Sequence, residues 1–272
     1  MKVASALAQA RVLGLDRLDA QLLLTHTLQQ PRAWLIAHDD AALTPGQQQT
    51  FSAACRRRAD GEPMAYLLGE REFHGLMLQV DAAVLVPRPD TETLVDWALE
   101  LLAAIEAPQV ADLGTGSGAI ALALKHARPA AHLCALDCSA AALQVARANA
   151  GRLGLALELV QGDWWQPLQG RRFHLVVSNP PYIAGDDPHL HALRHEPALA
   201  LTPGGDGLSA LAQIVREAPA HLRDGGWLLL EHGHDQHAAV QQLLSDAGFV
   251  SVGTRADLAG RPRCSGGHLP LR

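Results

Sequence analysis

The sequence predicts an α/β fold in which helices cover a mostly parallel sheet, preceded by a small helical domain. From Pro87 onward, short apolar segments of strand character alternate with segments of helical periodicity, which is typical of a parallel sheet. A glycine-rich turn, residues 114–118, follows one of the buried strands and opens a helix. Residues 1–69 show helical spacing of apolar side chains and no strand-like alternation.

The elements before Pro87 predict a helical domain and a hairpin. Within residues 1–69 the apolar spacing recurs at Leu15, Leu18, Leu22 and Leu23, Pro31 interrupts it, and further helices are expected over 34–37 and 45–58. In residues 70–86, short segments of strand character lie on both sides of a His74-Gly75 turn, which predicts a β-hairpin linking two domains. The expected domains are therefore 1–69, the linker 70–86, and 87–272.

The second domain is expected to begin with a helix over 90–105, with Pro89 before it and Asp90 or Thr91 as its cap. Strands are expected over 110–113, 132–137, 157–161, 173–178, 227–231 and 249–254. Helices are expected over 119–127, 139–153, 208–222 and 237–247.

Composition narrows the class of protein. A chain of 272 residues suggests about two domains. Hydrophobic residues make up 48% and charged residues 18%, which excludes intrinsic disorder. The net charge of −6 gives no overall attraction to a nucleic-acid backbone, so no direct nucleic-acid partner is expected.

Cysteine usage and hydropathy predict a cytoplasmic protein. None of the four cysteines forms a C-x-x-C pair, so they are interpreted as free thiols in a reducing compartment. No apolar run approaches the roughly 18 residues that a membrane span needs. The apolar N-terminal stretch is short and is interrupted by Gln9 and Arg11, which favours a helix over a signal peptide.

Three strand ends predict a pocket for an adenosine-containing ligand. Glycines at a strand-to-helix turn allow backbone to approach a ligand, and the carboxylate that ends the next strand can bind ribose hydroxyls. A further carboxylate and an aromatic ring after the third strand can contact adenine. The candidate residues are Asp112, Gly114, Thr115, Gly116, Ser117, Gly118, Asp137, Asp163 and Trp164. The acidic lining, with no phosphate-binding lysine, favours a cationic cofactor over a polyphosphate.

The fourth strand ends in Asn179-Pro180-Pro181-Tyr182, which indicates the chemistry. Prolines fix the backbone direction and remove two donors, so the strand end offers the Asn179 side-chain oxygen and the Pro180 carbonyl as acceptors. Two converging acceptors suit a planar NH₂ group, and the Tyr182 ring can stack on a planar amide or base. Asn179, Pro180 and Tyr182 are the candidate catalytic residues, and all four residues form the candidate substrate clamp.

This motif series resembles that of class I S-adenosylmethionine-dependent amino-methyltransferases. The whole chain is similar to the protein-(glutamine-N5) methyltransferases that modify peptide chain release factors, through Tyr66 to Phe73, Val86 to Glu92 and Leu230 to Gly233. The resemblance implies a Rossmann-like seven-stranded sheet, S-adenosylmethionine as cofactor, and a helical domain that recognises the substrate. It also implies, as substrate, the glutamine of the Gly-Gly-Gln motif of class 1 release factors, with cofactor contacts at residues 114–118, Asp137, Trp164 and Asn179.

Several features stand apart from this resemblance. The tail 257–268 begins as in the family but lacks the expected apolar residues at Cys264 to Gly266, which weakens the prediction of a last strand there. Histidines at His189, His191 and His195 complete no metal-ligand spacing, so no metal is expected. A monomer is expected, because no apolar association surface can be identified from the sequence.

The sequence also bears on three other functions. A nucleic-acid amino-methyltransferase acting on adenine N6 or guanine N2 would share the pocket and the acceptor pair, and the net charge argues against it. A nicotinamide-dependent oxidoreductase fits neither the glycine spacing nor the Asn179 motif. A non-catalytic binding module would leave Asn179 unexplained.

Overall fold

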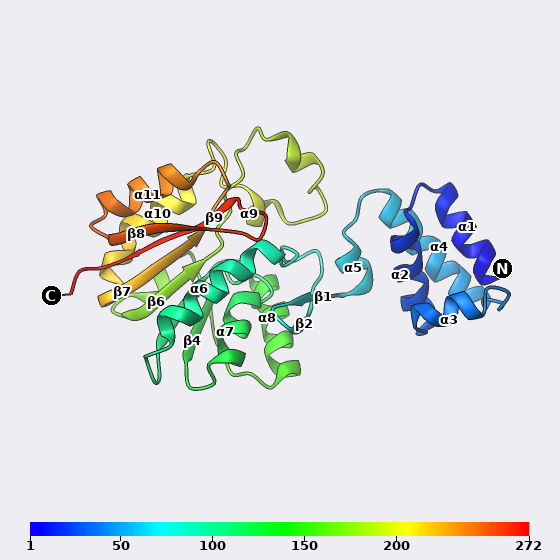
Figure 1. The fold of residues 1–272 in the computed structure, drawn as a ribbon, viewed down its shortest axis with the longest axis horizontal. Helices are drawn as coiled ribbons and strands as arrows, with labels where there is room; N and C mark the ends of the chain where they lie inside the picture. The colour runs from blue at the N-terminus through cyan, green and yellow to red at the C-terminus, as the bar shows by residue number, and fades with distance from the viewer. Residues whose placement is uncertain (272) are drawn as a thin grey trace. The chain divides into compact units, whose positions relative to one another are not determined.

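The computed structural model describes residues 1–271; Arg272, the last residue of the predicted second domain, lies outside them. The chain forms two compact units, Met1–Glu70 and Arg71–Arg272, which are considered separately (Figure 1). No helix within the described residues has the length and apolar character needed to cross a bilayer.

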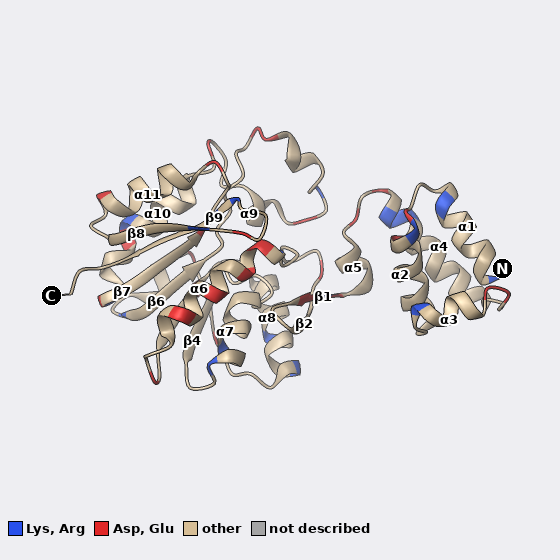
Figure 2. Cartoon of the chain, in the orientation of Figure 1, with Lys and Arg blue, Asp and Glu red and all other residues tan. Residues whose placement is uncertain are grey.

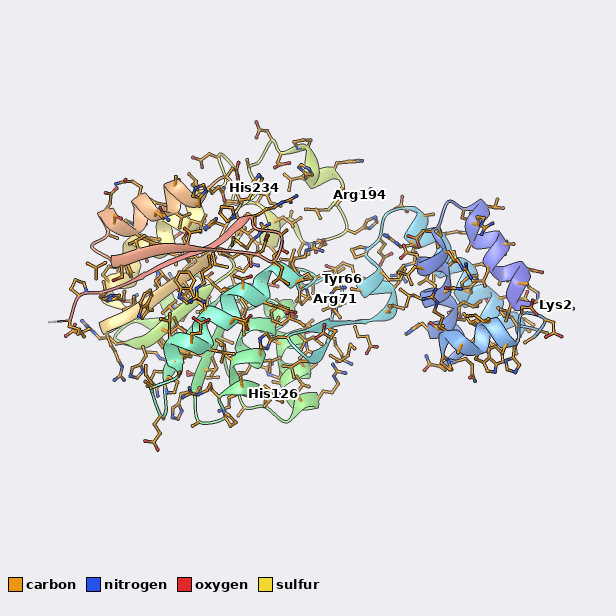
Figure 3. The ribbon with its side chains drawn as sticks, viewed as in Figure 1. Lys2, Tyr66, Arg71, His126, Arg194 and His234 are labelled. Atoms are coloured by element: carbon orange, nitrogen blue, oxygen red, sulfur yellow. The ribbon has the colours of Figure 1, made fainter. Side chains whose placement is uncertain are left out.

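The first unit consists of five helices around a small apolar core. They are α1 (Val3–Val12), α2 (Arg17–Leu28), α3 (Arg32–Ala37), α4 (Pro45–Ala59) and α5 (Met64–Leu68). Its core includes Leu24, Leu35 and Phe51, all at most 2% exposed. Helix α4 starts where the sequence predicts, because Thr44 and Gln47 form a capping box ahead of Pro45. Lys2, labelled in Figure 3, precedes α1.

The predicted hairpin forms from β1 (Glu70–Phe73) and β2 (Leu76–Gln79), with His74 and Gly75 at positive φ in its two-residue turn. It is fastened to α8 (Ala140–Leu153) by the buried side chain of Asn149. The Asn149 carbonyl oxygen accepts from the backbone N–H of Gln79, and its amide nitrogen donates to the carbonyls of Gln79 and Ser117 at 2.9 Å. One side chain therefore joins the hairpin, α8 and the glycine-rich turn.

The second unit is built on a seven-stranded sheet with strand order β5-β4-β3-β6-β7-β9-β8, which confirms the predicted α/β fold. The strands from β5 to β7 are mutually parallel, and β9 pairs antiparallel with both β7 and β8. The strands are β3 (Gln109–Leu113), β4 (His132–Asp137), β5 (Glu158–Gln161), β6 (Phe173–Ser178), β7 (Leu222–Glu231), β8 (Val250–Ala256) and β9 (Pro262–His268).

Two helical layers enclose this sheet (Figure 1). On one face, α6 (Glu92–Leu102), α7 (Ala119–Ala127) and α8 pack against inward-facing residues such as Leu133 and Val177. On the other face, α10 (Ser209–Glu217) and α11 (His237–Asp246) pack against residues such as Leu113 and Val176. Both faces are covered, so the central strands are continuous apolar runs, as expected of parallel strands.

Several predicted boundaries are wrong. The strand expected over 227–231 begins at Leu222, and the helix expected over 90–105 ends at Leu102. The helix expected over 208–222 ends at Glu217 and is followed by a 3₁₀ turn, Ala218–Ala220, because Pro219 has no N–H with which to continue the hydrogen bonds of the helix. Neither Asp90 nor Thr91 caps α6 with its side chain: a 3₁₀ turn, Pro89–Thr91, precedes that helix. The Thr91 side chain serves a different purpose, described below.

The tail does form the last strand, contrary to the weakened expectation. Strand β9 lies between β7 and β8, and Cys264, Ser265 and Gly266 are fully buried in it. Small residues are required there because the neighbouring strand presses close. A β-carbon at Gly266 would lie 2.3 Å from Leu229 Cδ2 and 2.7 Å from the Leu228 carbonyl oxygen.

A chain of side-chain hydrogen bonds also supports β9. His232 Nδ1 donates to the Gly233 carbonyl, so Nε2 accepts from the Ser265 hydroxyl at 2.8 Å. Ser265 Oγ then accepts from Thr254 at 2.6 Å, and Thr254 Oγ1 accepts from Gln241 at 2.8 Å. Burial lowers the pKa of His232, which keeps the ring neutral, as this donor order requires. Hydrogen bonds thus supply part of what apolar packing provides in other sheets.

We expect Gly266→Ala to lower the free energy of unfolding by roughly 1–3 kcal/mol, because the added methyl overpacks against Leu229. Urea denaturation measures this effect. The matched control is Gly253→Ala on β8, which is paired with Gly266 and has no atom within 4 Å of the added carbon. Equal midpoints for the two variants would contradict the account of β9.

Candidate active site

A cavity of about 340 Å³ lies where β3, β4 and β6 end. It is lined by loops that follow these strands, as expected for ligand sites in open parallel sheets. The predicted site residues on its wall are Gly114, Thr115, Gly116, Ser117, Asp137, Asp163, Trp164, Asn179 and Pro181. Four predicted residues do not line it: Asp112, Gly118, Pro180 and Tyr182.

The glycine-rich turn takes a conformation that other residues adopt only with strain. Gly116 has φ +57° and open space around it, and its N–H donates to Asp137 Oδ2 at 2.9 Å. Gly118 has φ +84°, and a β-carbon there would lie 3.1 Å from Leu122 Cδ1 and 3.3 Å from Ala146 Cβ. Gly116 therefore shapes the cavity wall, whereas Gly118 allows α7 and α8 to pack.

Asp112 holds this turn from below the cavity. It is 0% exposed, and its Oδ2 accepts from the Thr115 hydroxyl at 2.6 Å and from the Ala121 N–H at 3.2 Å. Burial raises the pKa of Asp112 to about 7, and those two hydrogen bonds oppose the shift. Its role is therefore to close the turn onto α7.

Asp137 ends β4 on the cavity wall. Its Oδ1 accepts from the Ser139 N–H and its Oδ2 from the Gly116 N–H, both at 2.9 Å. Burial raises the pKa of Asp137, and these hydrogen bonds counter it. The carboxylate is thus fixed in place, and each oxygen keeps a further lone pair for ligand hydroxyls.

Of the two adjacent tryptophans, only Trp164 belongs to the site. It has φ +42°, lines the cavity, and would lie 3.6 Å from a β-carbon at Gly114. Trp165 is 1% exposed, stacks on His221 and donates its indole N–H to the Ile214 carbonyl. The strained backbone at Trp164 directs one ring to the cavity and the next into the core.

Asn179 presents its side-chain oxygen to the cavity. In this orientation of the amide, its nitrogen donates to Thr91 Oγ1 at 3.3 Å and its carbonyl oxygen remains free to accept. Pro181 lies on the same wall, while Pro180 is buried behind it. The structure therefore brings the expected acceptor to the same cavity as Asp137 and the glycine-rich turn.

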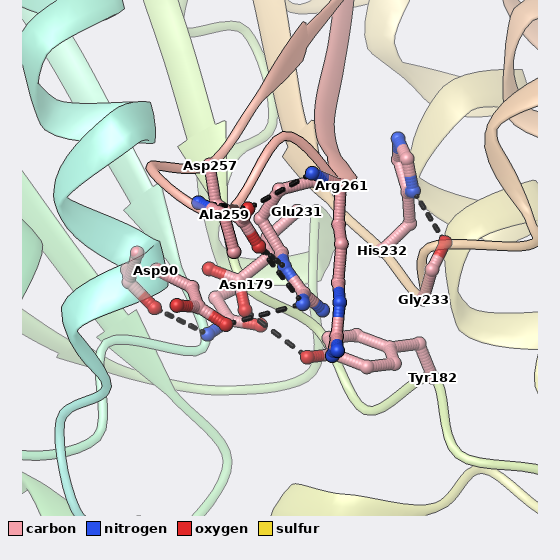
Figure 4. A network of polar contacts seen from close by, with 11 residues as sticks. Asp90, Asn179, Tyr182, Glu231, His232, Gly233, Asp257, Ala259 and Arg261 are labelled. Carbon is pink, nitrogen blue, oxygen red and sulfur yellow. Dashed lines mark hydrogen bonds and ion pairs between the residues drawn. The ribbon is translucent and has the colours of Figure 1, made fainter.

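Tyr182 lies away from the cavity wall, although its ring was expected to stack on the substrate. Its hydroxyl donates to Glu231 Oε1 at 3.1 Å (Figure 4). Burial and the charge of Glu231 raise its pKa, so the hydroxyl stays protonated. Its carbonyl oxygen accepts from Gln236, and Gly207 packs so closely that a β-carbon there would lie 2.2 Å from that oxygen. Tyr182 anchors the loop that carries Asn179.

Three further residues of the site, Thr91, Glu231 and Arg263, were not among those predicted from the sequence. Glu231 ends β7 at 1% exposure, and burial raises its pKa to about 7. Arg263 lies beside it and forms ion pairs with Asp90 at 3.1 Å and Asp257 at 3.2 Å. Strand pairing was the usable signal: Ser178 pairs with Leu230, so the next residues, Asn179 and Glu231, must be neighbours.

The loop after Tyr182 forms part of the cavity wall without forming a metal site. Glu196 is buried there and bridges Arg88, its ion-pair partner, to the backbone N–H of Val86. His189 hydrogen bonds to Asp187, and Arg194, labelled in Figure 3, belongs to the same loop. Across residues 1–271 no group of three or more ligating side chains could hold a metal ion.

The cavity fits an adenosine-bearing cation. Ser117 lines it, and its buried Oγ has no hydrogen-bond partner among the described residues, which leaves an unsatisfied hydroxyl beside the cavity. The carboxylates of Asp137 and Asp163 make the wall acidic, and Trp164 adds an aromatic face. Beside these groups, Asn179 provides an acceptor for the N–H group of a second molecule.

Comparison with known proteins agrees with this geometry. Residues 1–69 match the PrmC N-terminal domain, and residues 91–251 match the methyltransferase small domain. The release factor glutamine methyltransferase of Xylella fastidiosa strain Temecula1 is 51% identical over 97% of this chain and 98% of that protein. That of Bordetella pertussis is 50% identical over 94% and 96%.

A solved structure shows the same fold at low identity. The methyltransferase from Pyrococcus furiosus superimposes with a TM-score of 0.55 at 18% identity, covering 72% of this chain and 90% of that one.

We expect stability to depend on pH through Asp112. Its raised pKa means that the folded state holds a proton that the unfolded chain releases near pH 4. The contribution of this bound proton to the free energy of unfolding is therefore complete below about pH 4 and is lost as pH rises through about 7.

Asp112→Asn removes this titration. From pH 5 to pH 8 the unfolding free energy of the variant should gain roughly 2 kcal/mol relative to wild type. Urea denaturation at the two pH values measures the difference, and a constant gap would contradict a buried, proton-holding Asp112.

Proposed function

We propose, because the chain belongs to the release factor glutamine methyltransferase family, that it transfers a methyl group from S-adenosylmethionine to the side-chain amide nitrogen of a glutamine in a peptide chain release factor. The observation that carries this proposal is Asn179. A side-chain oxygen held toward the cavity, beside an acidic adenosine-type pocket, is what an incoming amide NH₂ requires.

The finer identity of the substrate rests on the motif series. The resemblance of residues 179–182 and of the flanking stretches supports the glutamine of the Gly-Gly-Gln motif in class 1 release factors, methylated at N5. The family match over residues 1–69 supports a helical unit that recognises this substrate. Residues 70–86 would then be the linker between that unit and the methyltransferase domain.

Residues on the cavity wall would hold the cofactor. Asp137 would accept hydrogen bonds from its ribose hydroxyls, Trp164 and Asp163 would contact its adenine, and residues 114–118 would give it close backbone approach. When bound, S-adenosylmethionine supplies a methyl carbon made electrophilic by a positively charged sulfur, which keeps the electron pair of the C–S bond that breaks.

The protein must activate a weak nucleophile, because an amide lone pair is delocalised into its carbonyl. Asn179 Oδ1 would accept one N–H bond, which orients the nitrogen and favours its pyramidalisation. The Pro180 carbonyl, which lies behind the cavity wall, is the second acceptor that the motif predicts. The same two oxygens stabilise the positive charge that develops as the C–N bond forms. The nitrogen releases one proton after the transfer, so no general base is needed before attack. Holding the glutamine nitrogen in line with the methyl carbon supplies the remaining rate enhancement.

The remaining partner assignments rest on the same reasoning. The expectation of a monomer rests on the sequence alone, and a release factor as substrate supports action in the cytoplasm. No direct nucleic-acid contact is expected. Acidic residues follow one another along α6 at Glu92, Asp96 and Glu100, shown in red in Figure 2, and the net charge is −6. Both would repel a polyanion.

We expect Asn179→Ala to lower kcat by about 10²- to 10³-fold, by analogy with the loss of one donor from an oxyanion hole. The dissociation constant for S-adenosylmethionine should stay close to the wild-type value, because the residues assigned to ribose and adenine are unchanged. Radiolabel transfer and calorimetry measure the two quantities. Near-normal turnover would remove Asn179 from the mechanism.

Substrate identity is tested with labelled S-adenosylmethionine and two forms of a class 1 release factor, the natural one and its Gly-Gly-Gln→Gly-Gly-Ala variant. Label should appear on the natural protein alone. Equal labelling of the two would place the modification elsewhere on the factor. Label on added RNA or DNA, with none on the release factor, would establish the nucleic-acid alternative instead.

A further inference from the structure

Asn179 can act only in one of its two amide orientations. The carbonyl oxygen must face the substrate amide. An Asn amino group in that place would set one hydrogen-bond donor against the N–H donors of the substrate. The contact of Asn179 with Thr91 does not by itself choose between them. A hydroxyl can accept from the Asn amino group, or it can donate to the Asn carbonyl oxygen. The orientation depends on which group accepts the hydrogen bond that the Thr91 hydroxyl donates.

Glu231 is the group that can accept this hydrogen bond. Its Oε1 accepts from Tyr182, while its Oε2 is buried and has no hydrogen-bond partner among the described residues. The Thr91 hydroxyl lies near this carboxylate and favours its ionised form, which lowers the pKa of Glu231. Thr91 is 4% exposed and Glu231 is 1% exposed, so water does not compete for these bonds.

The fold places these three residues together from separate elements. Asn179 follows β6 and Glu231 ends β7, the next parallel strand, while Thr91 ends the 3₁₀ turn before α6. Figure 4 shows Asn179, Tyr182 and Glu231 gathered at these strand ends. Thr91 also lines the cavity with Asn179, so the arrangement lies within reach of the substrate.

We propose that Thr91 and Glu231 are positioning residues: ionised Glu231 accepts a hydrogen bond from the Thr91 hydroxyl, Thr91 Oγ1 accepts from the Asn179 amino group, and the Asn179 carbonyl oxygen is held toward the substrate amide. This rests on the proposed function. Neither residue touches the reacting atoms, and both act through Asn179. The arrangement is favoured while Glu231 is ionised, because a carboxylate can only accept, whereas a protonated carboxyl can also donate to Thr91 and so reverse the order of donors.

The charge of Glu231 is set by neighbours from several elements. Arg263 of β9 lowers its pKa, whereas Asp90, from the turn before α6, raises it. Tyr182, from the loop after β6, donates a hydrogen bond that favours the ionised form. Cys264 of β9 also faces it. Burial is the largest influence and brings the pKa of Glu231 to about 7. Turnover should therefore fall as pH drops below about 7.

The first test compares Thr91→Val with Thr91→Ser in release factor methylation. Valine keeps the shape and removes the hydroxyl, so kcat should fall by about tenfold or more, with KM and cofactor affinity nearly unchanged. Serine restores the hydroxyl and should recover most of kcat. Thr93→Val, on α6 and away from the cavity, is the matched control and should behave as wild type. A Thr91→Val enzyme with full kcat would overturn the proposal.

The second test is the pH profile of kcat for wild type and Glu231→Gln, with melting temperature as the check on folding. Wild type should lose activity below about pH 7, and the variant should have a low kcat without that acidic limb. The same acidic limb in both enzymes would overturn the role of Glu231. A wild-type enzyme that does not methylate a release factor at all would instead refute the proposed function, so the two failures are distinguishable.

Discussion

The pairing of β6 with β3 on one side and β7 on the other is the constraint on which the site depends. Leu113 pairs with Ser178, and Ser178 pairs with Leu230, so all three strands end at one level of the sheet. Each strand then delivers a different group from that level: the glycine-rich turn, Asn179 and Glu231. A slip of one residue would turn alternate side chains to the opposite face and separate these groups.

Burial then gives two carboxylates of the site region unusual properties. Asp112 and Glu231 are each at most 1% exposed, and both have pKa values raised to about 7. Each is held by hydroxyl donors, Thr115 for the first and Tyr182 for the second. Such carboxylates order their surroundings because, where water is excluded, each nearby donor must point toward the carboxylate oxygens. One orders the cofactor turn and the other orders the loop that carries Asn179.

The sequence was sufficient for what local pattern controls. Several elements, including α7, β4 and β6, match the predicted ranges residue for residue, because apolar periodicity and glycine punctuation coincide there. Asn179 was identifiable because flanking prolines restrict its backbone. Thr91 was missed because a threonine before a helix suggests a cap, and only the tertiary fold shows its contact with Asn179. The last strand was underrated because its inner positions need small side chains, such as Gly266, rather than apolar bulk.

The buried side chain of Asn149 limits how far the second unit can be shortened from its N-terminal side. Its carbonyl oxygen and both of its amide protons are used in three hydrogen bonds, two to Gln79 of the hairpin and one to Ser117 of the glycine-rich turn. A fragment that started at Pro87 would leave one acceptor and one donor of this amide unsatisfied inside the protein. The smallest self-sufficient methyltransferase unit therefore starts at the hairpin, which makes residues 71–79 an integral part of the catalytic body as well as the route by which the chain enters it.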